Sequence, residues 1–183
     1  MNTRSFQSGL RQGGASLVVV MILLVVMTLL GLAVLRSTLL EERMSANLLD
    51  RSYAFQAAEA ALRQGEAVAG ADTTRAAVPA NGCTNGICSL PVATNLDRWL
   101  DPAFASTNWS AATAASRSAL APAAGYIVEY MGDAPTWPGC DLVDETSRSP
   151  LCLRPRYRIT ARSVDLANSD RAVVILQTNF IAL

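Results

Sequence analysis

The sequence contains no histidine and no lysine, and all fifteen of its basic residues are arginine. Without histidine, a serine or cysteine nucleophile cannot be paired with an imidazole base, and the common zinc sites with histidine ligands cannot form. Fifteen acidic residues balance the fifteen basic ones, so the formal net charge is zero. A neutral chain has no overall field that attracts nucleic acid or acidic substrates. These absences argue against an enzyme, a bound cofactor and a nucleic-acid partner.

The four cysteines lie in two pairs, Cys83 with Cys88 and Cys140 with Cys152, at spacings of five and twelve residues. Zinc sites usually have closer pairs, so these spacings favour disulfides formed in an oxidising compartment. Four cysteines allow three connectivities. Pairing between sequence neighbours is the simplest of them, and free thiols are the alternative to disulfides.

A long uncharged segment runs from Ala15 to Leu35. As a helix it would span about 31 Å, close to the roughly 30 Å hydrocarbon core of a bilayer. Arg4 and Arg11 precede it and no acidic residue occurs before Glu41, so the positive-inside rule places the N-terminus in the cytoplasm. A secretory signal peptide has a shorter apolar region and a small-x-small cleavage site. The segment therefore predicts a membrane-spanning helix that is retained.

The helix is expected to continue past the membrane, because no proline occurs before Pro79. Over residues 36–69 apolar side chains recur at helical spacing and share one face. These residues are Leu40, Met44, Leu48, Phe55, Ala58 and Leu62. The pattern predicts an amphipathic helix whose apolar face packs on a globular domain.

The rest of the chain predicts a connecting region followed by a small sheet. Residues 70–124 are rich in Ala, Thr, Ser, Asn and Pro and are expected to form a variable connection. Three strand-like runs follow, at Gly125–Gly132, Arg154–Val164 and Arg171–Leu183, with turn residues at Asp165–Asp170. Residues 125–183 therefore predict an antiparallel meander with a disulfide loop, one face on the helix and the other in water. The expected fold class is α+β.

Aromatic residues are few, at 6% of the chain. Three of them lie in the connecting region, at Trp99, Phe104 and Trp109. We expect them to anchor this region to the core, and exposed contacts to a ligand are the alternative interpretation.

One strand carries arginines on a single face, at Arg154, Arg156, Arg158 and Arg162. The simplest interpretation is a solvated strand face with cross-strand pairs to acids such as Glu129. A docking surface for an acidic protein partner is the alternative. Contact with a DNA backbone is the least favoured, because Tyr157 should face inward and no aromatic residue lies among the arginines.

Two further charged clusters are candidates for contacts. One follows the apolar segment, at Glu41, Glu42 and Arg43. It is either a charged collar at the membrane interface or a set of contacts between subunits. The other lies between Cys140 and Cys152, at Asp141, Asp144 and Glu145. Calcium prefers such oxygen ligands, but their spacing matches no standard calcium loop, so no metal site is predicted.

The segment Gly14–Arg63 closely resembles the N-terminal region of PilX-type minor pilins of the type IV pilus. Its most distinctive part is LEERMSANLLDRSYAFQAAEAALR, Leu40–Arg63, and the segment Tyr157–Phe180 resembles the end of the same family. The stretch Gln64–Ala124 carries no recognised resemblance. The family implies a pilin-like fold with a long N-terminal helix.

The resemblance also implies processing and assembly. A prepilin peptidase would remove the leader, residues 1–14, by cutting after Gly14, and Ala15 would be N-methylated. Residues 15–35 would first hold the subunit in the inner membrane, with the C-terminal domain in the periplasm, and later pack in the filament core. The implied partners are other minor pilins, the major pilin and the inner-membrane assembly platform.

One position departs from the usual pilin pattern. Most pilins carry glutamate at the fifth position after the cut, where this chain has Val19, or Val18 if the cut follows Gly13. A buried carboxylate is costly in lipid unless it is paired, and in pilins it is thought to meet the N-terminal amine of a neighbour. The absence of this glutamate implies a subunit that initiates the pilus or lies at its tip. There the subunit would support twitching motility and adhesion, and could carry a large tip adhesin.

Two alternatives remain open at this stage. One is a minor pseudopilin of a type II secretion system, although the tip pseudopilin of that system is usually considerably larger. The other is an uncleaved, single-pass anchored periplasmic binding domain.

Overall fold

The computed structural model describes residues 14–113, 124–165 and 171–183. Most of the expected leader, the end of the connecting region and most of the turn expected at Asp165–Asp170 lie outside the described residues. The chain divides into two compact units, Met1–Ala46 and Asn47–Leu183, and each is described by itself.

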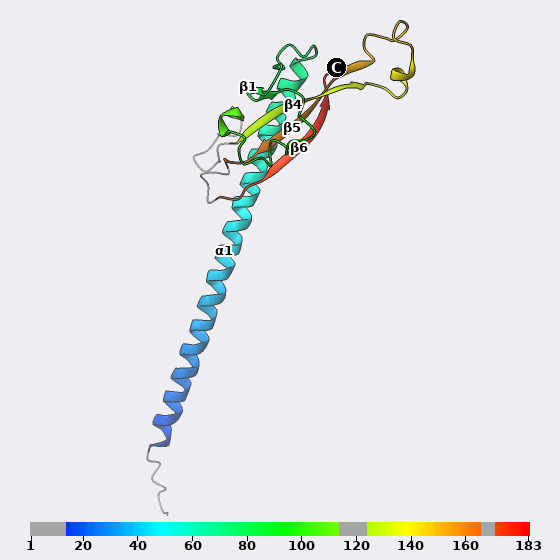
Figure 1. Ribbon diagram of the computed structural model, residues 1–183. Helices are drawn as coiled ribbons and strands as arrows, with labels where there is room; N and C mark the ends of the chain where they lie inside the picture. The colour runs from blue at the N-terminus through cyan, green and yellow to red at the C-terminus, as the bar shows by residue number, and fades with distance from the viewer. Residues whose placement is uncertain (1–13, 114–123, 166–170) are drawn as a thin grey trace, which may run out of the picture. The chain divides into compact units, whose positions relative to one another are not determined.

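Figure 1 labels the main elements along the chain. They are helix α1 (Ala15–Ala71), strands β1 (Cys83–Thr84), β2 (Ile87–Cys88), β3 (Ser110–Ala111), β4 (Gly125–Pro135), β5 (Leu153–Arg162) and β6 (Ile175–Ile181), and the 3₁₀ turns η1 (Ser106–Asn108) and η3 (Cys140–Leu142). Helix α1 therefore ends within two residues of the expected limit at residue 69.

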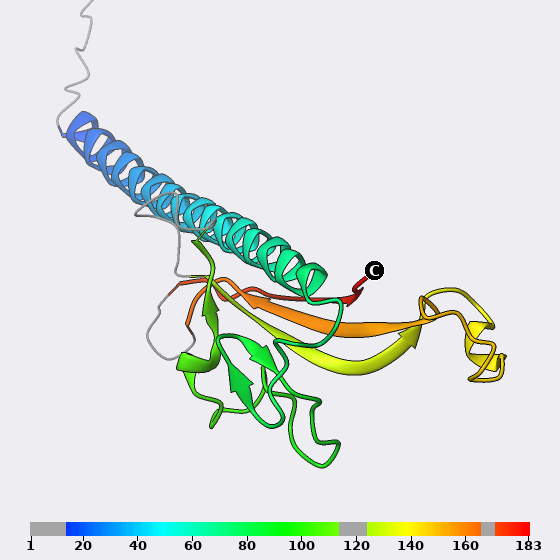
Figure 2. The same cartoon turned by 90° about the horizontal axis from the view of Figure 1, so that it is seen from above.

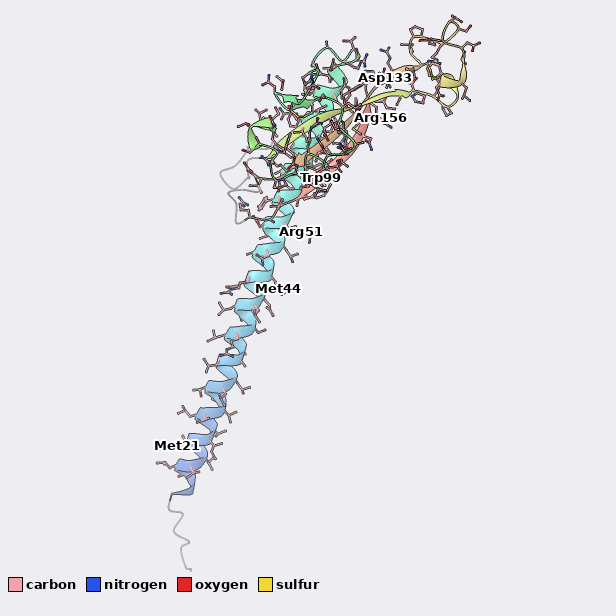
Figure 3. The ribbon with its side chains drawn as sticks, viewed as in Figure 1. Met21, Met44, Arg51, Trp99, Asp133 and Arg156 are labelled. Atoms are coloured by element: carbon pink, nitrogen blue, oxygen red, sulfur yellow. A yellow bond between two sulfur atoms is a disulfide. The ribbon has the colours of Figure 1, made fainter. Side chains whose placement is uncertain are left out.

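The first unit contains the apolar part of α1, which is long and apolar enough to cross a membrane. Its large side chains are exposed, and Met21, labelled in Figure 3, is one example. The hydroxyl of Thr28 donates a hydrogen bond of 2.8 Å to the carbonyl of Val25, which satisfies this polar group within the helix itself. A continuous apolar surface of this kind fits a membrane-anchored helix.

The second unit is built around the sheet, whose order is β1-β2-β4-β5-β6, with β3 paired to β4. Strands β4, β5 and β6 are successive antiparallel neighbours, so the expected meander is confirmed. Strand β2 pairs with β4 in parallel, which makes the sheet mixed. The register of β4 and β5 places Glu129 opposite Arg158.

Residues 47–71 of α1 lie along one face of the sheet (Figure 2). The prediction that the large apolar side chains of this helix pack on the domain is wrong for most of them. Leu48, for example, is 67% exposed and Phe55 is 51% exposed. The buried helix residues are mainly small, namely Ala54, Ala57, Ala58, Ala61, Leu62, Gly65 and Ala69. Small side chains let the helix backbone lie close to the strands. The buried face of the helix is therefore the one with small residues, and not the one with large apolar residues.

The opposite face of the sheet is covered in part, so the expectation that it meets water is wrong for β4 and the adjoining part of β5. On this face Gln177 and Asn179 of β6 are exposed, as expected. Figure 2 shows the described segment 72–113 lying over the covered part. Part of that segment is the hairpin β1–β2, whose turn residues Asn85 and Gly86 have positive φ angles of 50° and 81°. Asn-Gly between two strand-like runs is the strongest short-range hairpin signal, and it occurs in CTNGIC, residues 83–88.

Candidate functional site

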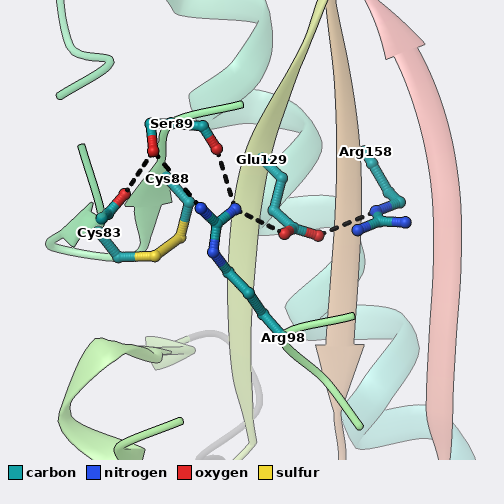
Figure 4. Close-up of a disulfide and its surroundings, with 7 residues drawn as sticks. Cys83, Cys88, Ser89, Arg98, Glu129 and Arg158 are labelled. Atoms are coloured by element: carbon teal, nitrogen blue, oxygen red, sulfur yellow. Dashed lines mark hydrogen bonds and ion pairs between the residues drawn. A yellow bond between two sulfur atoms is a disulfide. The ribbon is translucent and has the colours of Figure 1, made fainter. Parts of the chain in front are cut away.

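Glu129 is the centre of a buried charge network on the covered face of the sheet (Figure 4). Glu129 is 0% exposed. Arg98 Nη1 donates to Glu129 Oε1 at 2.8 Å, and Arg158 Nε donates to Glu129 Oε2 at 2.9 Å. Arg98 Nη1 also donates to the carbonyl of Ser89 at 2.9 Å, next to the Cys83–Cys88 disulfide. The network thus joins the connecting segment to two central strands.

Arg158 has a second acidic partner, Asp97, whose Oδ1 lies 2.9 Å from Arg158 Nη1. Burial by itself lowers the pKa of the Arg158 guanidinium, but the hydrogen bonds and charges of Glu129 and Asp97 raise this pKa above its ordinary value. Arg158 is therefore held as a cation between two carboxylates that come from different parts of the chain.

Arg162 is also covered, at 8% exposure. Its guanidinium carbon lies 4.3 Å from the centre of the Trp109 ring, and its Nη1 lies 3.4 Å from Asp165 Oδ1. Burial lowers the pKa of Arg162, and the charge of Asp165 opposes this effect. The side chain is thus a desolvated cation stacked on an aromatic face.

The four arginines predicted as one solvated stripe have different environments. The predicted cross-strand pairing of this stripe with Glu129 is confirmed, and Arg158 is the arginine that makes it. A solvated environment is wrong for Arg158 and Arg162, because the connecting segment covers that part of β5. Arg154 is half-buried, and Arg156, labelled in Figure 3, is exposed. Arg156 Nη2 donates to the carbonyl of Met131 at 3.2 Å. Only the far end of the stripe remains accessible to a partner.

Both disulfides join cysteines that are neighbours in sequence, Cys83 with Cys88 and Cys140 with Cys152. The first closes the β1–β2 hairpin, and the second closes the loop between β4 and β5. The acidic residues of this loop, Asp141, Asp144 and Glu145, are exposed. No group of three or more metal-ligating side chains occurs in the part of the chain that the structure describes.

Two tethers that the sequence did not reveal hold α1 to the sheet domain. The first tether is at Asp50. Its Oδ1 accepts a hydrogen bond of 2.6 Å from Arg171 Nη2, and its Oδ2 accepts one of 2.7 Å from the amide of Ala172. The Ala172 amide, followed by Arg171, lowers the pKa of the Asp50 carboxyl. These contacts connect residues more than a hundred positions apart, so no local sequence pattern predicts them.

The second tether is at the C-terminal end of α1. The hydroxyl of Tyr157 donates to the carbonyl of Asp72 at 2.8 Å or to its Oδ2 at 3.0 Å. Burial, and then the hydrogen bond to Asp72, raises the pKa of this hydroxyl. Tyr157 thus faces the helix side, as the alternation of β5 predicts.

The predicted processing residues and the charged cluster at residues 41–43 lie in the first unit. Gly14 is exposed and immediately precedes α1, which begins at Ala15. Val19 is 55% exposed within the apolar part of the helix. Glu41, Glu42 and Arg43 are all exposed.

A long apolar N-terminal helix joined to a mostly antiparallel sheet defines an α+β, pilin-like protein. Residues 12–63 match the family model described as PilX N-terminal, and residues 65–182 match that of type IV pilus assembly protein PilX C-term. The chain therefore belongs to the PilX family of type IV pilus assembly proteins, as the resemblance at Gly14–Arg63 predicted. No curated protein sequence and no solved structure matches the chain.

Proposed function

We propose that this PilX-family subunit initiates type IV pilus assembly and then stays at the pilus tip. The observation that carries the proposal is Val19, an apolar residue at the position of the usual pilin glutamate, in a helix with no acidic residue before Glu41. A subunit without that carboxylate offers no charge to the N-terminal amine of a subunit already in place. Such a subunit suits a single starting position better than repeated insertion along the shaft.

Maturation forms the first part of the proposal. A prepilin peptidase cuts after Gly14 on the cytoplasmic side, and Ala15 receives a methyl group. The position of Gly14 just before α1 supports this assignment. Residues 15–35 then anchor the mature subunit in the inner membrane, with residues 36–183 in the periplasm, before the subunit moves to the cell surface with the pilus.

Contacts with partners form the second part. The exposed residues Glu41, Glu42 and Arg43 are available for ion pairs with neighbouring pilin subunits. On the sheet domain, Arg156 is exposed and Arg154 half-buried, and these two can meet an acidic surface of another minor pilin or of a large tip adhesin. Arg158 and Arg162 are excluded from this role by their burial.

Processing is tested by the intact mass of the protein extracted from membranes. We expect the mass of residues 15–183 plus one methyl group, and a gain of about four hydrogens on reduction of the two disulfides. A mass that starts at Met1 would contradict processing and leave an uncleaved anchored domain. A mass that starts after Leu35 would indicate an ordinary secreted protein.

The assembly role is tested by deletion of the gene and by counting subunits on pili. We expect deletion to abolish surface pili and twitching motility while type II secretion continues, and gold-labelled protein to lie at one end of each filament. Loss of secretion with normal twitching would indicate a pseudopilin instead. Label spread along the shaft would contradict the tip position. The matched variant is Val19→Glu, which restores the usual pilin glutamate, and we expect it to be inserted along the shaft more often.

A further inference from the structure

A pocket of about 440 Å³ lies on the covered side of the sheet, between the connecting segment and the end of β5. Its walls include three aromatic rings and four charged side chains, namely Trp99, Phe104, Trp109, Arg98, Asp101, Arg162 and Asp165. A pocket that combines apolar walls with a few polar groups has the usual composition of a small-molecule site. Nothing in the proposed assembly role requires such a pocket.

The aromatic rings are held in defined positions. The centroids of Phe104 and Trp109 are 6.4 Å apart with the rings at 73°, an edge-to-face arrangement. The Trp109 ring is covered on one face by Arg162, whose guanidinium lies 4.3 Å from the ring centre. Trp99, labelled in Figure 3, is partly buried and lines the same pocket. The pocket therefore has rigid ring surfaces against which a flat apolar face can pack.

Most charged groups of the pocket are paired within the protein. Two arginines line it, Arg98 and Arg162, and two aspartates line it, Asp101 and Asp165. Arg98 pairs with the buried Glu129 and Arg162 with Asp165, which leaves the carboxylate of Asp101, whose Oδ1 accepts a hydrogen bond of 2.8 Å from the amide of Ala103. An anion would face this carboxylate in a partly desolvated site. The charges therefore disfavour an anion and suit a neutral ligand whose hydroxyls can donate to Asp101 and accept from the arginines.

The polar groups retain bonding capacity for such a ligand. Arg162 uses Nη1 toward Asp165, while its Nε is buried and has no hydrogen-bond partner among the described residues. A buried donor without a partner is costly, and a small shift of the Arg162 side chain toward the pocket would let a ligand oxygen bond to it. Carboxylates such as Asp101 accept hydrogen bonds, and a hydroxyl group can serve both kinds of partner.

We propose that this pocket binds a neutral carbohydrate ring. A sugar has an apolar C–H face, which can pack on the electron-rich face of Trp99 or Trp109, and a rim of hydroxyls, which can bond to the arginine and aspartate groups. The subunit would then contact glycans directly as well as through any partner at the tip. This binding is independent of pilus assembly, so either property can fail without the other.

The tryptophans provide a direct measurement, because the chain has three and two of them line the pocket. The third, Trp137, is 44% exposed and does not line the pocket. The full-length Trp137→Phe variant, in a detergent that contains no sugar, is titrated with neutral methyl glycosides of glucose, galactose, mannose, N-acetylglucosamine and N-acetylgalactosamine. We expect at least one of them to change the tryptophan fluorescence in a saturable manner.

The assignment to the pocket is tested with Trp99, which forms part of a surface turn. Saturation-transfer NMR reports binding independently of fluorescence, and in that assay Trp99→Ala should weaken binding about tenfold or more, as truncation of a central aromatic contact commonly does. Trp99→Phe keeps a ring and should retain most of the affinity. Circular dichroism verifies that both variants are folded.

Three results would overturn the proposal. The first is the absence of binding to any neutral glycoside. The second is binding only of anions, tested with phosphate and N-acetylneuraminic acid, which would contradict the charge argument. The third is protection of Trp99 and Trp109 from hydroxyl-radical labelling in assembled pili, relative to the free subunit, because a neighbouring protein would then occupy the pocket.

Discussion

Replacement of Glu129 by glutamine is expected to lower the free energy of unfolding by about 3–5 kcal/mol, the range for breaking a buried ion pair by removing one partner. Glutamine has nearly the same shape, but it leaves Arg98 without its carboxylate partner at 2.8 Å and Arg158 with Asp97 alone. For a domain of this size the melting temperature should fall by about 10–17 °C. Thermal and urea unfolding followed by circular dichroism measures the effect.

The matched control for this variant is Glu59→Gln. Glu59 pairs with Arg63 on the surface of α1, where the two side chains are 39% and 71% exposed. A pair of this kind contributes at most about 1 kcal/mol, so the control should melt close to the wild type. Equal stabilities of the two variants would mean that the buried arginines do not depend on Glu129.

Replacement of Gly65 by alanine is the second change with a large expected effect. A Cβ atom at this position would lie 2.6 Å from Ile159 Cγ2 and 3.1 Å from Tyr126 Cδ2. Ile159 is fully buried, so it cannot move aside easily. Overpacking should destabilise the domain by about 1–3 kcal/mol, although alanine favours a helix by about 1 kcal/mol over glycine.

Gly70 in the same helix is the control for this prediction. A Cβ there would lie 3.5 Å from Phe180 Cζ, an ordinary contact. Gly70→Ala should therefore leave stability unchanged or raise it by up to about 1 kcal/mol. Urea unfolding of both variants tests the pair, and a stabilised Gly65→Ala protein would show that α1 does not approach the sheet as closely as the structure has it.

Features that depend on neighbouring residues were predictable from the sequence. The apolar segment, the end of α1 near residue 69 and the three strands of the meander follow from composition and periodicity. The pairing of each cysteine with its sequence neighbour was also the simplest expectation. The β1–β2 hairpin belongs to this group too, since its Asn-Gly turn is a signal carried by two adjacent residues.

The candidate site was only partly predictable. The sequence predicted Arg158 and Arg162 as part of a solvated stripe, and of their contacts only the cross-strand pairing with Glu129 was expected. Their burial was not, because the segment that covers them has no strong periodicity and pairs with β4 through strands of two residues each. The aromatic residues Trp99 and Trp109 were expected to anchor this segment, and the structure places both beside a pocket as well.

The long apolar helix, the three successive strands and the two short cysteine pairs are predictable from local sequence, because each depends on the chemistry of adjacent residues. Which side of α1 is buried and which arginines reach water depend on contacts between distant segments. Alanine and glycine carry little hydrophobic signal, yet Ala58, Ala61 and Gly65 are buried, because a helix can approach a sheet closely only through small side chains. Likewise, an alternating strand identifies two faces, but what covers each face depends on segments distant in the chain.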